Sequence, residues 1–182
     1  MKSVLIAIRP KWVAKIESGE KTIEVRKTAP QEVPFKCYIY ETKGQYVKFT
    51  HGAHTKYGYG RGKVIGEFIC DKVYSIKNRG SSFSVADEEQ SVTNEIARQS
   101  CLYYDDMVSY FGNKDGFGWH ISDLKIYDKP KELSEFCIPC KVSCENCKNP
   151  LYFECWCEEK GKKIVTRPPQ SWCYVEDLGE EK

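Results

Sequence analysis

Two hydrophobic periods follow each other within the first 26 residues. Val4–Ile8 alternates apolar side chains toward one face, which is the period of a β-strand. Pro10 supplies the backbone angle favoured in the first turn of a helix, and apolar residues then recur at spacings of three and four. Thr22–Arg26 alternates again. The pattern predicts a strand, a helix from about Pro10 to Ser18, and a second strand with one solvated face.

The rest of the chain repeats the strand pattern in short segments that do not alternate regularly with helices. Further strands are expected over Phe35–Tyr40, Lys63–Ile69, Gly116–Leu124 and around Tyr174, and short helices around Val92–Ile96 and over Asp105–Phe111. This mixture indicates an α+β fold built around a partly closed antiparallel sheet with short flanking helices. We expect a single domain, residues 1–182, with a small cysteine-rich lobe inserted at residues 137–163.

The charge balance excludes a partner chosen by the net field of the molecule. The chain has 28 basic and 26 acidic residues, a net charge of +2, so an argument for nucleic acid must rest on local clusters. The apolar run Val4–Ile8 is too short for a signal peptide or a membrane span. We therefore expect a cytoplasmic protein that does not bind membranes.

The strongest local motif is GEKTIEVR, residues 19 to 26. Gly19 suits the turn from helix to strand, and the side chains of Lys21 and Arg26 are donors for phosphate or a base edge. Glu24 can accept a hydrogen bond from an amino group or orient a cation. The alternative is structural: Glu24 pairs with Lys21 or Arg26 on a solvated sheet face.

This G-x-K-x-x-E-x-R motif, placed after a strand and a helix, resembles the ASCH family of the PUA-like superfamily. The segments AIRPKWVAKI, GWHISDL and RPPQSWCYVE also resemble family segments, so the resemblance covers residues 1 to about 128 and 167 to 176. It implies a PUA-like β-barrel fold that binds RNA or a modified nucleotide in a pocket lined by Lys21, Glu24 and Arg26. Residues 168 to 171 are expected at the rim of this pocket.

The same resemblance implies a second possibility, an enzyme. One ASCH-like branch consists of amidohydrolases that remove the acetyl group from acetylated cytidine with a Lys, a Thr three positions later, and a Glu. Lys21 matches that Lys, but Glu24 stands where the branch has Thr, and Thr22 occupies the adjoining position. If the protein is an enzyme, Lys21 and Glu24 are the catalytic candidates. A ribonuclease that uses Lys21 with a Tyr or His is a further possibility.

A basic, aromatic segment lies between Glu41 and Glu67. It contains five Lys or Arg residues, no acid, and several Tyr and Gly residues, a combination suited to phosphate contacts and base stacking. The alternative is a charged hairpin loop without a ligand. Trp119 is equally compatible with a base pocket and with the core. The candidate nucleic-acid contacts are Arg9, Lys11, Lys21, Glu24, Arg26, Lys56, Tyr59, Arg61, Lys63 and Trp119.

Six of the ten cysteines fall within residues 137 to 157. Such density indicates structural zinc, because Zn(II) prefers four thiolates and can fold a lobe too small for its own core. The preferred ligands are Cys140, Cys144, Cys147 and Cys155, with Cys137 and Cys157 as alternates. Free thiols, incidental disulfides and an iron–sulfur cluster are the other interpretations. The lobe also suggests an adaptor, in which it contacts a protein partner through the charged segment Glu154–Lys163.

Overall fold

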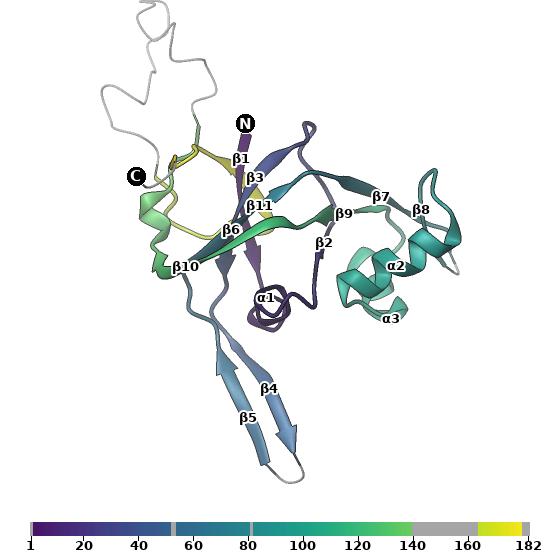
Figure 1. Ribbon diagram of the computed structural model, residues 1–182, viewed down its shortest axis with the longest axis horizontal. Helices are drawn as coiled ribbons and strands as arrows, with labels where there is room; N and C mark the ends of the chain where they lie inside the picture. The colour runs from purple at the N-terminus through teal and green to yellow at the C-terminus, as the bar shows by residue number, and fades with distance from the viewer. Residues whose placement is uncertain (1, 52–53, 81, 140–163, 180–182) are drawn as a thin grey trace, which may run out of the picture.

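The structure is a computed structural model that describes residues 2–51, 54–80, 82–139 and 164–179 (Figure 1). Its strands form a five-stranded sheet, a four-stranded sheet and a separate hairpin. The five-stranded sheet has the order β10 (Ser122–Lys131), β6 (Val64–Cys70), β3 (Phe35–Glu41), β1 (Lys2–Ile8), β11 (Trp172–Val175). The four-stranded sheet has the order β2 (Ile23–Arg26), β9 (Gly116–His120), β7 (Val73–Asn78), β8 (Phe83–Val85). The hairpin consists of β4 (Gln45–His51) and β5 (His54–Tyr59).

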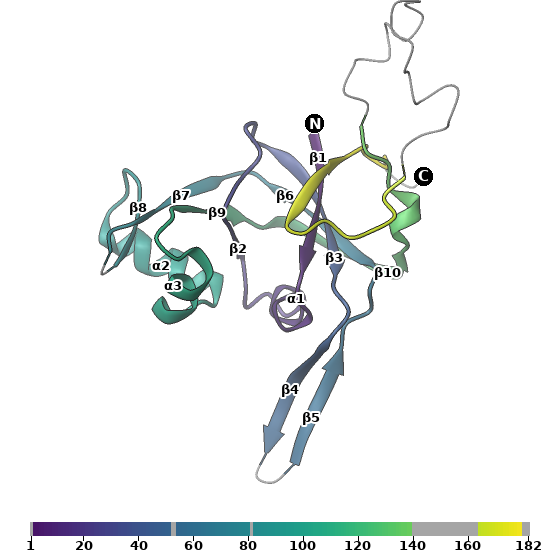
Figure 2. The same cartoon turned by 180° about the vertical axis from the view of Figure 1, so that it is seen from behind.

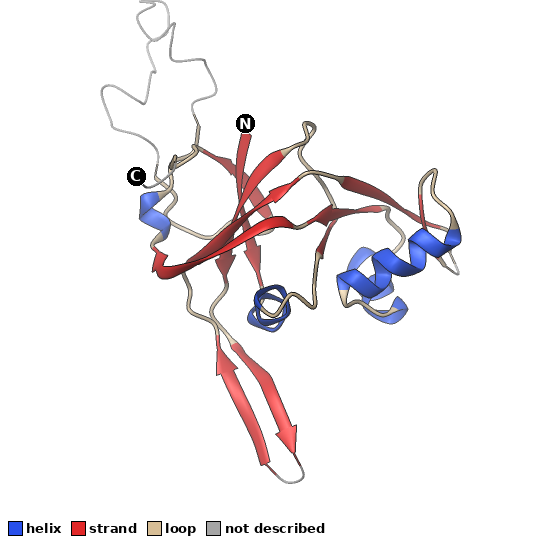
Figure 3. Ribbon diagram, viewed as in Figure 1, coloured by secondary structure: helices blue, strands red, loops and turns tan. Residues whose placement is uncertain are grey.

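Three α-helices and one 3-10 turn complete the described elements (Figure 3). The helices are α1 (Pro10–Glu17), α2 (Gln90–Ser100) and α3 (Tyr104–Phe111), and the 3-10 turn is Leu133–Glu135. The predicted α+β fold class is confirmed. One detail differs from the antiparallel expectation, because β1 and β3 are parallel, and neither sheet closes on itself among the described strands.

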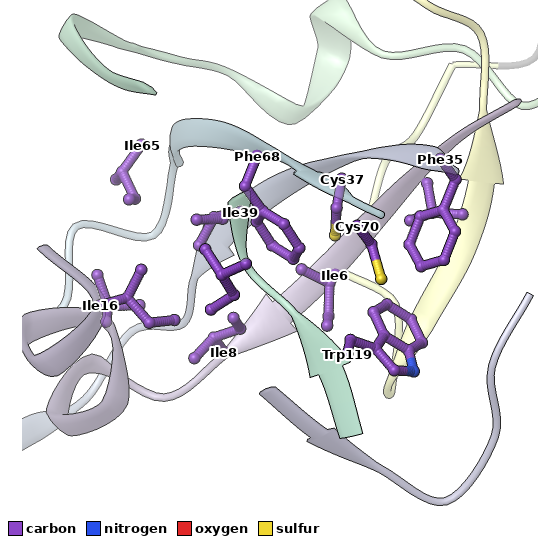
Figure 4. Packing of buried hydrophobic residues seen from close by; sticks show 13 residues of the cluster. Ile6, Ile8, Ile16, Phe35, Cys37, Ile39, Ile65, Phe68, Cys70 and Trp119 are labelled. Carbon is purple, nitrogen blue, oxygen red and sulfur yellow. The ribbon is translucent and has the colours of Figure 1, made fainter. Parts of the chain in front are cut away.

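The main core includes residues of both sheets and of α1 (Figure 4). Trp119 of β9 is fully buried there, with its ring 5.1 Å from that of Phe35 and 5.8 Å from that of Trp172, both in edge arrangements. This contradicts the expectation that Trp119 contacts nucleic acid, because a side chain with 0% exposure offers no face to a base.

A second apolar cluster attaches α2 and α3 to the four-stranded sheet. Ile96 of α2 and Met107 and Phe111 of α3 bury their side chains with Ile23 and Val25 of β2. All four residues of β2 are buried, so the predicted solvated face is wrong. Alternation gave the correct faces, but the polar face of β2 lines a pocket instead of facing bulk water.

The predicted lobe begins and ends at one place on the domain. Cys137 and Ile164 form an isolated antiparallel β-bridge, and Val165 donates its backbone N–H to Phe136 at 2.8 Å. The chain then returns along the edge of the five-stranded sheet, where β11 pairs antiparallel with β1 (Figure 2). Asp177 attaches the end of this segment by accepting hydrogen bonds from Lys36 at 3.0 Å and Tyr38 at 2.6 Å.

Candidate functional site

A cavity of about 470 Å³ lies where the start of α1, the polar face of β2 and one side of α3 meet. Residues 168 to 171, which precede β11, form part of its rim, as predicted. Local sequence explains two of the walls. Pro10 begins α1 directly after β1, and Gly19, at φ +76°, turns the chain from α1 toward β2. The motif residues therefore lie on or just before the short strand β2, beside α1, which precedes them in the sequence.

The floor of the pocket is a buried ion cluster of Lys21, Glu24 and Arg26, whose exposed fractions are 2%, 5% and 7%. A terminal nitrogen of Arg26 lies 2.9 Å from Oε1 of Glu24, and Nζ of Lys21 lies 3.4 Å from Oε2. The two cations against one carboxylate leave a formal charge of +1. A buried excess of positive charge favours an anionic ligand, since water screens it little.

Backbone carbonyls hold the two cations in place. Lys21 donates to the carbonyl oxygens of Ile23 and Ser100, both at 2.7 Å, and Arg26 donates to that of Ala7 at 2.8 Å. Strands β1 and β2 and the end of α2 thus position one cluster. The motif predicted that Lys21, Glu24 and Arg26 act together, and the structure brings them together.

Two polar atoms of the cluster are buried without a hydrogen-bond partner among the described residues. They are Oε2 of Glu24, whose ion pair with Lys21 is too long for a good hydrogen bond, and Nε of Arg26. A buried polar atom left unpaired costs about 1–3 kcal/mol. One acceptor and one donor of the cluster therefore have unused hydrogen-bonding capacity among the described residues.

Burial and the neighbouring carboxylate act on the pKa of Lys21 in opposite directions. Burial lowers the pKa of Lys21 below the ordinary value of 10.5, and the neighbouring Glu24 carboxylate opposes this effect. The ammonium form already donates to two carbonyls and faces the carboxylate. This geometry suits Lys21 to electrostatic binding, because a protonated amine has no lone pair with which to act as a base.

Two aromatic side chains stand above this cluster. Trp12 of α1 is half-buried, and Nζ of Lys11 and of Lys21 lie 4.2 Å and 5.4 Å from its ring centroid. Tyr110 of α3 has Nζ of Lys27 at 5.2 Å from its ring, and partial burial raises the pKa of its hydroxyl. Both rings line the cavity.

Sequence reasoning missed both rings as site residues. Trp12 fits the apolar face of α1, a position typical of a core side chain, and Tyr110 has no local motif around it. The helical period shows which residues share a face, but it does not show what lies opposite that face. A signal for Trp12 did exist, since Arg9 and Lys11 closely precede it in sequence and both line the cavity.

The other predicted nucleic-acid residues separate into two groups. Arg61 and Lys63 lie at the base of the hairpin in ion pairs, Arg61 with Glu17 at 2.7 Å and Lys63 with Glu132 at 2.7 Å. Lys56 and Tyr59 lie on β5 and are exposed. None of these four lines the pocket.

The predicted zinc ligands are not tested by the structure. Cys140, Cys144, Cys147, Cys155 and the alternate Cys157 lie outside the described residues, and Cys137 is described as a partly exposed free thiol. Within the described ranges, no group of three or more His, Cys, Asp or Glu side chains is arranged to hold a metal ion.

Comparison with known proteins is informative at the level of the fold. No protein-family model and no curated protein matches the chain. The structure does match the crystal structure of an ASCH protein from Zymomonas mobilis, with a TM-score of 0.55 and 18% identity over 96% of this chain and 88% of that chain. The chain has the ASCH fold. Two single-residue variants of the Zymomonas mobilis protein match with TM-scores of 0.54 and 0.53 at 18% and 16% identity, covering 96% and 97% of this chain and 89% and 91% of theirs.

Four residues of the GEKTIEVR motif line the pocket described above. In the part of the chain that the structure describes, no helix is long and apolar enough to cross a membrane.

Proposed function

We propose that the pocket binds a nucleotide, presented by RNA or carrying a modified base. The observation that carries this proposal is the buried Lys21–Glu24–Arg26 cluster, which combines a positive charge with one free acceptor and one free donor. A simple anion site needs no buried acceptor, and a site for an apolar molecule needs no buried charge. A nucleotide supplies both an anionic phosphate and a base edge with adjacent donors and acceptors.

The walls of the pocket support the same ligand class. Trp12 and Tyr110 give flat faces on which an unpaired base can stack. Arg9 and Lys11 are exposed at the rim, where they suit contacts to phosphate oxygens. The cavity volume of about 470 Å³ lies in the range of small-molecule sites.

Two observations favour binding over catalysis. Thr22, the hydroxyl residue closest to the amidohydrolase pattern, does not line the cavity. Lys21 donates to two carbonyl oxygens and forms an ion pair with Glu24, as expected of a fixed electrostatic group. The test below therefore also checks for hydrolysis of an acetylated nucleoside. Lys21 and Glu24 are the catalytic candidates for that reaction.

The test is binding of nucleoside monophosphates, the matching nucleosides, acetylated cytidine and an RNA trinucleotide, followed by chromatography for products. Arg9→Ala/Lys11→Ala removes two exposed charges without disturbing the core. We therefore expect the affinity for monophosphates to fall tenfold or more and the affinity for nucleosides to change little. Lys21→Ala should weaken both classes.

Lys15→Ala is the matched control, because Lys15 lies on α1 in an exposed ion pair with Glu20 and outside the cavity. Binding that is unchanged in the Lys21 and Arg9/Lys11 variants would refute the proposal. Release of acetate that is lost in Lys21→Ala would make the site an enzyme.

We further propose that the cysteine-rich lobe binds structural zinc. Support comes from the spacing of Cys140, Cys144, Cys147 and Cys155, and from the bridge between Cys137 and Ile164, which brings the two ends of the segment together. A segment whose ends are already joined loses less entropy when a metal organises it. Metal analysis of the full chain should give about one zinc per chain. Substitution of all four cysteines by Ser should abolish it, whereas zinc retained by that variant would contradict the assignment.

A further inference from the structure

The hairpin of β4 and β5 is a structural unit of its own. Its two strands pair only with each other among the described strands, and they extend away from both sheets (Figures 1 and 2). A strand of seven residues spans roughly 20 Å. An isolated two-stranded hairpin is marginally stable and adds little to a core, so an arm of this length has no evident structural role.

The base of the arm is fixed beside the pocket. Gly60 donates its N–H to the carbonyl of Gly44 at 2.8 Å, and the backbone N–H of Arg61 donates to Oε2 of Glu41 at 2.8 Å. Arg61 also pairs with Glu17 at the end of α1. Thr42, just before β4, lines the cavity. The arm therefore begins at a wall of the cavity to which α1 also contributes residues.

One face of the arm presents large side chains to solvent. Val47 pairs with Tyr57, and Gln45 pairs with Tyr59, so these four side chains share a face. Val47, Tyr57 and Tyr59 are 58%, 52% and 72% exposed. On the other face, the ring of Tyr46 covers Gly58 so closely that a Cβ there would lie 2.4 Å from it.

The charge of the arm favours a polyanion. Between Glu41 and Glu67 the sequence contains no acid, and Lys48 and Lys56 are exposed on the two strands. The charges of Arg61 and Lys63 are already neutralised at the base. By the alternation of β5, Lys56 lies on the face opposite Tyr57 and Tyr59. A narrow two-stranded arm with exposed rings on one face, a lysine on the other and no acids suits stacking of unpaired bases together with phosphate contacts.

We propose that the arm binds single-stranded nucleic acid that continues from the nucleotide in the pocket, so that the ligand is a strand and not a free nucleotide. This inference rests on the proposed function. Lys48 and Lys56 contact phosphates, and Tyr57 and Tyr59 stack on bases next to the one in the pocket. A duplex does not fit this role, because its bases are not free to stack on the tyrosines.

The test compares a nucleoside monophosphate with single-stranded RNA of about 12 nucleotides, a length within the range of single-strand sites. Lys48→Ala/Lys56→Ala should weaken RNA binding and leave monophosphate binding unchanged. The slope of log K against log salt should become less steep by about 1.4, which is two phosphate contacts at about 0.7 each. Tyr57→Ala/Tyr59→Ala should lower the affinity for RNA by roughly tenfold or more and leave the salt slope of binding unchanged.

The matched control is Lys114→Ala/Lys129→Ala, which removes two exposed lysines outside the arm. DNA of the same sequence shows whether the sugar matters, and the duplex of the same length should bind more weakly. The proposal is overturned if both arm variants bind the 12-mer as wild type does, or if the duplex binds as tightly as the single strand. Failure of the proposed function appears separately, as monophosphate binding that does not depend on Lys21.

Discussion

At the scale of single residues, the pocket depends on how three charged groups share one buried site. Glu24 balances Arg26 at 2.9 Å and Lys21 at 3.4 Å, and all three side chains are at least nine-tenths buried. Removing one partner from a buried ion pair leaves an uncompensated charge in a medium that solvates it poorly. The stability of the domain and the character of the site therefore depend on the same carboxylate.

Glu24→Gln keeps the shape of the side chain and removes its charge. We expect it to lower the free energy of unfolding by about 3 kcal/mol, because Arg26 and Lys21 lose their shared counter-ion. Glu20→Gln is the control, since Glu20 pairs with Lys15 in solvent and should change stability by about 0.5 kcal/mol or less. Urea unfolding measures both values. Equal effects of the two substitutions would contradict the buried-cluster interpretation.

At the scale of elements, close backbone approach joins the hairpin to the domain. A Cβ on Gly60 would lie 1.9 Å from the carbonyl oxygen of Thr42 and 2.5 Å from Cγ of Pro10. Only a residue without a side chain lets the base of the arm pass this close to the start of α1. The run YGYGRGK, residues 57 to 63 of the basic, aromatic segment, thus contains a packing requirement at one of its glycines.

Gly60→Ala should displace the base of the arm and lower the free energy of unfolding by about 1–3 kcal/mol, the usual cost of overpacking. Thr55→Ala, on an exposed part of β5, should change it by about 0.5 kcal/mol or less. Thermal unfolding monitored by circular dichroism compares the two variants. A Gly60→Ala protein as stable as wild type would show that the arm is not packed against α1 as described.

At the scale of the whole molecule, the end of the described chain closes the fold and shapes the pocket. Residues 168 to 171 line the cavity, β11 then pairs with β1, and Asp177 attaches the segment to Lys36 and Tyr38 of β3. Burial alone would raise the pKa of Asp177, but the hydrogen bonds from Tyr38 and Lys36 outweigh it and hold this pKa below its ordinary value. Because the folded-state pKa is lowered, the stabilisation is present above the unfolded value near 3.8 and is lost as pH falls through the folded value.

Asp177→Asn should therefore destabilise the protein by about 1 kcal/mol at pH 7, a value kept small because Asp177 is exposed on one side. As pH is lowered from 7 to 2, the difference between variant and wild type should shrink, because the stabilisation by the charged carboxylate is lost as pH falls through the folded-state pKa. Urea unfolding at the two pH values measures it, with Asp128→Asn on β10 as the exposed control. A difference that is independent of pH would contradict a role for the charge of Asp177.

The sequence by itself determined several strands of the two sheets, the first helix and the grouping of Lys21, Glu24 and Arg26, because hydrophobic period and a compact motif are local properties. The helix predicted from Pro10 to Ser18 is observed as Pro10–Glu17, and the predicted strand Phe35–Tyr40 as Phe35–Glu41. Strands β4, β5, β7 and β8 were missed. The alternation of β7 and β8 is weak, and they form strands because β7 pairs with β9 and β8 pairs with β7.

Only the tertiary structure decided what faces those elements. It buried Glu24 and Arg26, which alternation had placed in solvent, and it placed Trp119 in the core and Trp12 in the pocket. The physical reason is that period assigns a side chain to one face of its own element, whereas burial depends on the elements that pack against that face. Those elements, among them α3 with Tyr110 and residues 168 to 171, come from distant parts of the chain.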